Sequence, residues 1–379
     1  MQDGKIYMPG PYGVFVDALA NECELLTLIA HKAKGNEIGE ADFALRQKNI
    51  NWINLGEKSP SWYRAIFHKK ILGNSLLDFN SFDAVLVRSP TPLAPYFRKY
   101  IKKAKLVFMV VGDYADGAMH YTINSFRDRI IQLYLLHNDY LFRKELNYVD
   151  ILVNSPGLFD KYASKAKSIK LIKTTTLSLS DFFDRDDTCQ HKLVQLLYTG
   201  RIDLAKGLKE LVQAVAELSK EEIKVQLNIA GWETDGNKTI ELELLELAKE
   251  LNISHSIRFH GRKKIGKELN EMYRMNDIYV LPSYHEGFPR TIWEAMANSL
   301  PVIASEVGGI PSFLKNQQEA YFIQPKSVSE ICIAVNDLIQ NKELRMKIIA
   351  NGRELAKENT LEVQSKKIVN HIQQLIKNE

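Results

Sequence analysis

Short apolar runs alternate with longer stretches of helical period along almost the whole chain. Runs such as 105–111 (KLVFMVV) and 148–154 (YVDILVN) are nearly continuous in apolar residues, which is typical of strands that are buried on both faces. Residues 239–251 instead carry an apolar stripe at helical spacing, formed by Ile240, Leu244, Leu247, Ala248 and Leu251. This alternation of strands and helices predicts an α/β fold built from doubly wound parallel sheets.

The length of the chain, 379 residues, exceeds what a single hydrophobic core usually serves, so two domains are expected. We place the first domain at residues 1–180 and the second at residues 192–360. The segment 181–191 (DFFDRDDTCQH) is polar and acidic and has no apolar period, which favours a linker. Residues 361–379 are predicted to form a separate terminal helix.

The most informative stretch is 279–309, which has the pattern of a strand, a polar loop, a short helix and a second strand. Its order places Glu286 in a loop at the carboxyl end of a strand and Glu294 on the helix that follows. Thr291 is predicted to cap this helix. The first amides of the helix then face the loop as unpaired donors with partial positive charge, and such helix ends attract anions.

Two readings of the Glu286 and Glu294 pair are open. Most charged side chains are solvent-exposed, so a solvated loop acid and a surface helix residue are the simpler interpretation. Gly287 and the pair Gly308-Gly309 favour a site, because glycines mark close backbone approach or unusual dihedral angles. They flank the two acids at neighbouring strand ends, so we favour carboxylates that accept hydrogen bonds from sugar hydroxyls.

At this point the residues carry a family resemblance. The pattern E-G-F-x-R-T-x-x-E-A-M-A, followed by P-V-I-A-S-x-x-G-G-I, resembles the signature of the family 4 retaining glycosyltransferases, which have the GT-B fold. A second block at 198–215 (YTGRIDLAKGLKELVQAV) resembles the family's G-R-x-x-x-x-K-G segment. The resemblance rests on specific motifs in the C-terminal half and on element order alone in the N-terminal half.

The resemblance implies two facing Rossmann-like domains, with the donor bound by the second and the acceptor by the first. It also implies that the last helix crosses back onto the first domain. Arg201 and Lys206 would clamp the donor diphosphate and stabilise the leaving group, Glu286 would bind the donor sugar near its anomeric carbon, and Glu294 would hold the ribose. The remaining implied donor-binding positions are Gly200, Arg262, Lys263, Gly287, Phe288, Pro289, Arg290 and Thr291.

In the N-terminal half, Gly13 follows the first predicted strand. It either lets the backbone approach a phosphate or sugar, as the first loop does in GT-B enzymes, or simply makes a tight turn. Family members often have a histidine at the end of the strand that here ends in Val111. Asp113 or His120 stands nearby, and the sequence does not choose between them.

Cysteine usage and acidic motifs argue against a disulfide framework or a metal site. Cys23, Cys189 and Cys332 are far apart, and they match no disulfide or metal-ligand spacing. The D-x-D spelling at 184–186 falls in the predicted linker, so we attribute it to chance. No cofactor is expected, because two cations and a helix end can stabilise a leaving diphosphate without a metal.

Charge is distributed unevenly. Residues 1–180 hold 24 Lys and Arg against 17 Asp and Glu, whereas residues 181–379 hold 26 against 29. A basic first half suggests an anionic partner. The stretch 59–73 is predicted to be a helix that combines basic and aromatic residues, which favours either a membrane surface or packing on the sheet. The stretch 96–105 is predicted to be a basic helix that contacts phospholipid head groups, binds nucleic acid or is simply a solvated face. We find no nucleic-acid-binding motif, and we expect no nucleic-acid partner.

The sequence therefore predicts a retaining transferase that moves a sugar from a UDP- or GDP-linked donor to a hydroxyl of a glycan or lipid-linked acceptor. Cell-surface polysaccharide synthesis is the expected setting, by analogy. The first residues lack the pattern of a signal peptide, so a cytoplasmic location is expected, with peripheral contact to the inner face of the membrane. The alternatives are a GT-B phosphorylase or sugar-phosphate synthase, and a catalytically silent nucleotide-sugar binding subunit.

Overall fold

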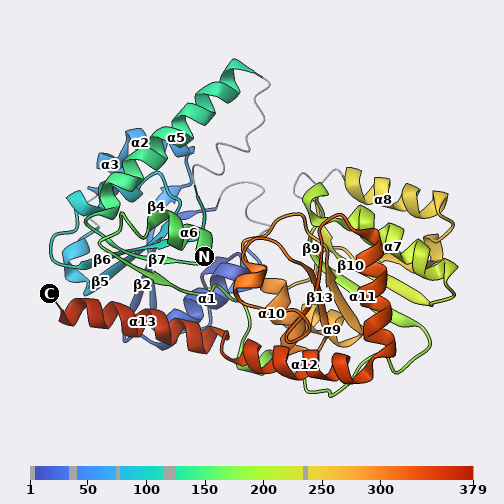
Figure 1. The fold of residues 1–379 in the computed structure, drawn as a ribbon. Coiled ribbons are helices and arrows are strands. Elements are labelled where there is room, and N and C mark those ends of the chain that lie inside the picture. Colours follow the sequence, from blue (N-terminus) through green and yellow to red (C-terminus); the bar gives the residue numbers. More distant parts are fainter. Residues whose placement is uncertain (1–4, 34–40, 74–76, 114–124, 234–237, 379) are drawn as a thin grey trace. The chain divides into compact units, whose positions relative to one another are not determined.

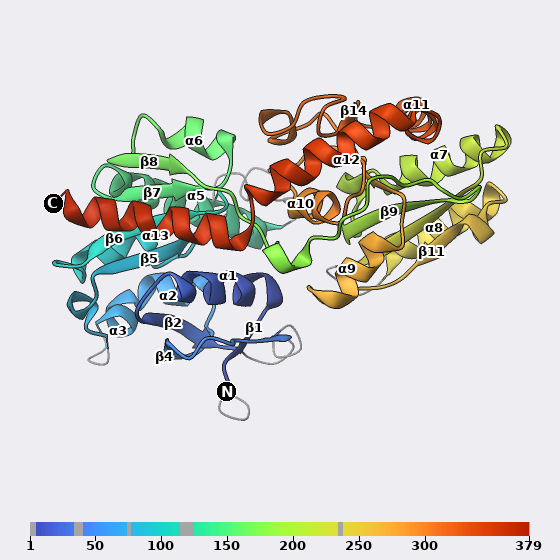
Figure 2. The ribbon, with the colours of Figure 1, turned by 90° about the horizontal axis from the view of Figure 1, so that it is seen from below.

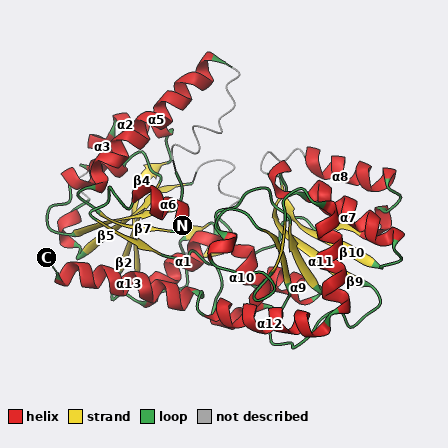
Figure 3. Ribbon diagram, viewed as in Figure 1, coloured by secondary structure: helices red, strands yellow, loops and turns green. Residues whose placement is uncertain are grey.

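The computed structural model describes residues 5–33, 41–73, 77–113, 125–233 and 238–378. Its internal contacts divide the chain into two compact units. The first unit comprises the residues up to Thr174 together with Gln364 onwards, and the second runs from Thr175 to Val363 (Figure 1). Each unit has parallel strands flanked by helices, as the alternating pattern predicts (Figure 3).

The first unit contains a four-stranded parallel sheet in the order β5-β6-β7-β8, a parallel pair β2-β4 and a short antiparallel pair β1-β3. Its strands are β1 (Tyr7–Met8), β2 (Leu26–Lys32), β3 (Phe43–Ala44), β4 (Ile50–Glu57), β5 (Ala84–Ser89), β6 (Lys105–Val110), β7 (Asp150–Val153) and β8 (Ser168–Leu171). Its helices are α1 (Gly10–Asn21), α2 (Ser61–Ile66), α3 (His68–Leu72), η2 (Phe79–Ser81), η3 (Ala94–Lys99), α5 (Phe126–Leu146) and α6 (Pro156–Tyr162).

The end of the chain packs on this first unit. Helix α13 (Leu361–Lys377) begins in the second unit, but its residues from Gln364 onwards belong to the first. Ile368 is fully buried in a cluster with Leu19, Val107 and Leu152, so the helix covers strands β6 and β7 beside α1 (Figure 2).

The second unit has one six-stranded parallel sheet in the order β11-β10-β9-β12-β13-β14. Its strands are β9 (Val194–Arg201), β10 (Val225–Trp232), β11 (Ile257–Phe259), β12 (Ile278–Leu281), β13 (Val302–Ser305) and β14 (Tyr321–Ile323). Its helices are η4 (Leu179–Asp181), η5 (Leu204–Lys206), α7 (Leu208–Lys220), α8 (Thr239–Glu250), η6 (Ser254–Ser256), α9 (Lys267–Arg274), α10 (Arg290–Ala297), η7 (Ile310–Ser312), α11 (Val328–Gln340) and α12 (Lys342–Lys357).

The central strands β9 and β12 are almost entirely buried, because helices cover both faces of the sheet (Figure 1). Helix α7 is amphipathic and buries Leu208, Leu211 and Val215 in the core of the unit. Helix α10 is buried over most of its surface, including Trp293, because it packs between α9, α12 and the sheet. This burial explains why apolar residues lie on more than one face of the helix.

Several predicted element boundaries need correction. Gly13 lies inside α1 and not before it, because the helix already starts at Gly10. Pro11 fits the first turn of the helix, where a backbone nitrogen needs no hydrogen-bond partner within the helix. The stretch 59–73 forms two short helices instead of one, and 96–105 contains the end of the 3₁₀ helix η3 and the first residue of β6. Strand β6 ends at Val110, and the amide of Val111 still donates to the carbonyl of Ser89.

The predicted linker 181–191 is instead anchored in the second unit. Asp187 accepts two hydrogen bonds, of 2.6 and 3.0 Å, from the buried guanidinium of Arg345. Arg185, inside the D-x-D spelling, donates to the backbone carbonyls of Tyr273, Arg274, Asn276 and Ser299. The segment looks like a linker because its charges follow no period, but those charges bind partners far away in the sequence.

Candidate active site

Two loops of the second unit lie side by side at one edge of its sheet. Strands β9 and β12 are parallel neighbours, so the loops that follow their carboxyl ends meet at the same edge. The backbone amide of Tyr284, in the loop after β12, donates to the carbonyl of Ala205, in the loop after β9, over 2.8 Å. This bond fixes the two loops to each other.

Lys206 and Glu286 form an ion pair across these loops. The Nζ of Lys206 lies 2.7 Å from Oε1 of Glu286, and the two side chains are only 14% and 12% exposed. The hydroxyl of Ser283 donates to the same oxygen over 2.8 Å. A lysine ammonium carries three donors, so this pairing orients Lys206 and leaves further donor capacity.

Glycines permit the close approach of the backbone around this pair. Gly207 has a φ of +65°, and a side chain there would clash with the carbonyl of Pro282. Gly308 has a φ of +56°, and its Cβ would overlap the carbonyl oxygen of Glu286. The amide of Gly309 donates to the carbonyl of Gly287 over 2.7 Å. The predicted close approach at Gly308-Gly309 is therefore confirmed, whereas Gly287 itself faces open space.

Glu294 is held by side chains from two other segments. Its Oε1 accepts a 2.6 Å hydrogen bond from the hydroxyl of Thr176, and its Oε2 accepts a 2.9 Å bond from Tyr273. The residue is 8% exposed, so the interpretation of Glu294 as a surface residue is wrong. Burial, together with the charge of Glu294, raises the pKa of Tyr273 well above its ordinary value, which keeps its hydroxyl a proton donor.

The start of α10 differs from the predicted cap. The helix begins at Arg290 after Pro289, and Thr291 lies inside its first turn. The hydroxyl of Thr291 instead accepts a 2.7 Å hydrogen bond from Tyr279 on β12. Proline leads this helix because its fixed backbone angle suits the entry into a helix. The ring of Phe288 stacks on Trp293, with centroids 4.4 Å apart.

Arg201 and Lys206 have separate carboxylate partners. The side chain of Arg201 is 58% exposed, and its Nη2 lies 4.0 Å from the carboxylate of Asp203. Gly200 precedes it with a φ of +145°, and the hydroxyl of Tyr198 donates to the carbonyl of Arg201. The local backbone is therefore held firmly, whereas the guanidinium itself extends towards solvent.

Arg262 and Lys263 follow β11, which is two strands away from β9 in the sheet. The guanidinium of Arg262 lies over the ring of Trp232, 4.9 Å from its centroid, and Lys263 is half-buried. Trp232 is the last residue of β10. Arg262 and Lys263 thus lie, like Lys206, beyond the carboxyl ends of the parallel strands, next to β10 and β11.

Two positions in the first unit have structural partners. A side chain at Gly13 would clash with the ring of Phe43, so packing against this ring is enough to require a glycine there. The carboxylate of Asp113 forms an ion pair with Lys161. His120, the other candidate near Val111, lies outside the described residues.

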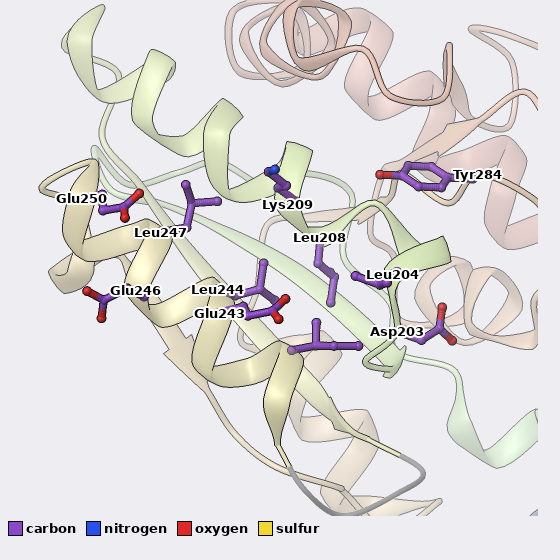
Figure 4. A pocket seen from close by; sticks show the side chains of 11 residues that line it. Asp203, Leu204, Leu208, Lys209, Glu243, Leu244, Glu246, Leu247, Glu250 and Tyr284 are labelled. Carbon is purple, nitrogen blue, oxygen red and sulfur yellow. The ribbon is translucent and has the colours of Figure 1, made fainter.

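A cavity of about 400 Å³ lies between η5, α7 and α8 (Figure 4). Leucines 204, 208, 244 and 247 form its apolar part, and Glu243, Glu246 and Glu250 stand at its margin. None of the predicted site residues lines it, so we do not place the donor there.

The described residues contain neither a metal-ligand cluster nor a membrane-spanning helix. Across the described ranges, no three His, Cys, Asp or Glu side chains gather as a metal site would need. Over the same residues, no helix combines the length and the apolar character needed to cross a bilayer.

Sequence reasoning missed the residues that position the two glutamates. Ser283 is close to Glu286 in the loop, and its spacing is a usable signal. Thr176 and Tyr273 come from segments far from Glu294 in the chain, and nothing local in the sequence marks them.

Residues 181–355 match the family model described as glycosyl transferases group 1. This segment is a group 1 glycosyltransferase domain. It contains Lys206, Glu286 and Glu294, so the ion pair and the buried carboxylate lie within the group 1 region of the chain.

Some similar proteins match nearly the whole chain. Protein CapJ from Staphylococcus aureus is 26% identical over 342 residues, which cover 89% of this chain and 83% of CapJ. A glycosyltransferase from Rickettsia africae ESF-5 superposes with a TM-score of 0.71 and 18% identity, covering 97% of this chain and 95% of that one. HepE from Anabaena, solved with UDP and glucose, gives a TM-score of 0.68 and 15% identity, covering 96% of both chains.

The two structural matches show the fold. They confirm the predicted GT-B architecture of two Rossmann-like domains. The group 1 domain and its relatives also confirm that the chain is an enzyme, a glycosyltransferase of class EC 2.4.

Proposed function

We propose that this glycosyltransferase moves a sugar from a nucleoside diphosphate sugar to a hydroxyl acceptor with retention of anomeric configuration. The observation that carries the proposal is the Lys206–Glu286 ion pair. It places a cation and a carboxylate together at the carboxyl ends of neighbouring parallel strands, where ligands of open α/β sheets bind.

The leaving diphosphate gains negative charge as the glycosidic bond breaks. Lys206, oriented by Glu286, offers its remaining donors to a β-phosphate oxygen and stabilises that charge. Arg201 adds a guanidinium from an exposed position, where it can turn from Asp203 to the diphosphate. The free amides at the start of α10, around Phe288 to Thr291, supply further donors.

The two glutamates bind hydroxyl groups in this proposal. Glu286 accepts hydrogen bonds from the donor sugar near its anomeric carbon. Glu294 holds the ribose: each of its oxygens already accepts one bond, and a carboxylate oxygen can accept another. Arg262 and Lys263 contact the base or a phosphate from the β11 side. We leave Gly13 out of this donor site, because the contact that requires a glycine there is with the ring of Phe43.

Retention needs no nucleophile from the enzyme in this scheme. The leaving phosphate takes the proton of the acceptor hydroxyl on the same face of the sugar, while the new glycosidic bond forms. Two observations support this route: Val111 stands where family members often have a histidine, and the carboxylate of Asp113 is paired with Lys161.

HepE was solved with UDP and glucose, which supports a UDP-linked hexose as the first donor to test. The acceptor in our proposal is a hydroxyl of a glycan or a lipid-linked glycan, in cell-surface polysaccharide synthesis. The alternative acceptors are phosphate and a sugar phosphate, as in a phosphorylase or sugar-phosphate synthase. Product analysis by mass spectrometry with each acceptor class separates these reactions.

The deciding experiment is thermal unfolding with UDP, GDP and ADP. A nucleotide that binds only the folded chain at 100 times its Kd adds about 2.7 kcal/mol of stability. We expect a clear upward shift with one nucleotide, and a smaller one in Glu294→Gln. The matched control is Glu354→Gln on the exposed face of α12, which should keep the full shift. If no nucleotide shifts the folded wild type, the donor site is wrong.

Metal independence is tested on the same protein. Donor turnover should be unchanged after treatment with EDTA, because Lys206 and Arg201 carry the charge that a metal carries elsewhere. Loss of turnover in EDTA, with recovery on adding Mg²⁺ or Mn²⁺, would contradict this part of the proposal.

A further inference from the structure

Helix α5 of the first unit has apolar residues on two opposite faces. Its inner face buries Phe142 and Leu146 in the core of the unit. On the opposite side, Phe126, Ile130 and Leu133 follow the spacing of one helix face and are 80%, 54% and 65% exposed. Tyr140 continues this stripe and is 55% exposed. A helix that is apolar on its outer face as well normally has something covering it.

Helix α2 adds to this surface. Trp62 and Ile66, one turn apart, are 54% and 64% exposed, and Phe67 follows them at 42%. The hydroxyls of Ser61 and Tyr134 lie 2.8 Å apart, so the start of α2 meets the middle of α5. We call the exposed apolar residues of α2 and α5, together with Phe67 directly after α2, the α2–α5 surface: Trp62, Ile66, Phe67, Phe126, Ile130, Leu133 and Tyr140.

Basic side chains accompany the α2–α5 surface. Residues 61–72 contain three basic residues and no acidic one, and Lys69 and Lys70 are exposed. At the start of α5, Arg127 and Arg129 are exposed beside Phe126. Further along, the Nζ of Lys144 lies 4.4 Å from the centroid of the Tyr140 ring. The surface therefore presents apolar and aromatic groups together with positive charge.

We propose that the α2–α5 surface docks on an anionic phospholipid bilayer. Aromatic and aliphatic side chains enter the boundary between head groups and acyl chains, and the lysines and arginines contact lipid phosphates. Tryptophan and tyrosine favour this boundary because their rings are apolar and their tips are polar. A second copy of the chain fits less well, because a symmetric contact would place the same basic residues opposite each other.

This inference does not depend on the donor chemistry. It concerns a surface of the first unit, whereas the donor residues lie in the second. If the acceptor is lipid-linked, as proposed above, docking would hold the enzyme at the surface where that acceptor lies.

Vesicle flotation tests the proposal. We expect the full chain to float with vesicles of phosphatidylcholine containing phosphatidylglycerol, but not with phosphatidylcholine alone, and to release in high salt. Ile130→Ser with Leu133→Ser should lower the partition coefficient at least tenfold, because each buried CH₂ contributes to binding. The matched control is Leu242→Ser with Ile333→Ser, two exposed apolar residues of α8 and α11 that should not matter.

Charge and fold are checked separately. Lys69→Glu with Lys70→Glu should also weaken binding to anionic vesicles. Should the double serine variant lose its circular dichroism spectrum, Trp62→Ser serves in its place, because α2 is short and peripheral. Without lipid, release of nucleotide from the donor should be equal in the wild type, the α5 double serine variant and the Lys69→Glu, Lys70→Glu variant. This readout distinguishes a failed donor site from a failed membrane surface.

Three results would overturn the proposal. The first is a wild type that stays with the soluble fraction, and the second is equal binding by the α5 double variant and the control. The third is a dimer by analytical ultracentrifugation that the α5 substitutions dissociate, which would assign the surface to a second copy of the chain.

Discussion

Each unit places a glycine near the start of its first α-helix, but the two glycines have different roles. Gly13 of α1 lies against the ring of Phe43, an apolar contact inside the first unit. Gly207 precedes α7 with a left-handed backbone and lies against the carbonyl of Pro282, which follows β12. The first contact fills space, whereas the second brings two loops together and places Lys206 beside Glu286.

The difference shows what a strand-glycine-helix pattern can and cannot indicate. It marks a close approach in both units, because only glycine leaves room for the neighbouring atoms. The identity of the neighbour decides whether a site results. At Gly207 the neighbour is a backbone carbonyl close to Lys206 and Glu286, and at Gly13 it is the half-buried ring of Phe43.

The largest effect should come from Lys206→Ala. Removing this cation should lower donor turnover by about a hundredfold or more, because the charge that develops on the leaving phosphate loses its main partner. Lys209→Ala is the matched control, since this lysine is exposed one turn further along and should keep turnover within about twofold. Steady-state kinetics measures both. Turnover within a few fold of wild type in Lys206→Ala would remove Lys206 from the mechanism.

Gly308→Ala should have the next largest effect. A methyl group there would overlap the carbonyl of Glu286, and the left-handed backbone adds strain of about 1 kcal/mol or more. The loop should shift, lowering turnover about tenfold, and urea unfolding should show reduced stability. Gly287→Ala is the stability control, since its Cβ would meet open space. Equal stabilities of the two variants would show that the crowding at Gly308 has no energetic effect.

Tyr273→Phe should act on donor binding. Loss of its hydroxyl removes one hydrogen bond from Glu294, so KM for the donor should rise several-fold with a smaller change in kcat. Stability should fall by about 1 kcal/mol. Tyr321→Phe is matched, because that hydroxyl also donates to a carboxylate, of Asp337, over 2.7 Å. Tyr321→Phe should lose similar stability, but its KM for the donor should not change. If KM rises equally in both variants, Tyr273 does not position Glu294 for donor binding.

Gly13→Ala should have the smallest effect and concerns stability alone. The added methyl group overpacks the contact with Phe43 and should cost about 1 kcal/mol. Phe43→Leu should recover part of this loss in a double-mutant cycle, since the two residues touch. Turnover should stay at the wild-type level. If turnover falls while stability does not, Gly13 faces a ligand after all.

Local patterns in the sequence determined much of the second unit. The apolar runs and stripes located its strands and helices, and the order strand-loop-helix placed Glu286 at the carboxyl end of β12. Gly308-Gly309 correctly marked a close backbone approach. These features follow from neighbouring residues, because helix and strand periods and the conformational range of glycine are local properties.

Only the tertiary structure decided which distant groups meet. Glu294 is buried because Thr176 and Tyr273 close around it, and Arg185 and Asp187 belong to the second unit because their partners lie far along the chain. The outer face of α5 stays exposed because nothing in the described chain packs on it. Charge and hydrophobicity along a sequence show what a residue can bind, but packing of remote segments determines what it does bind.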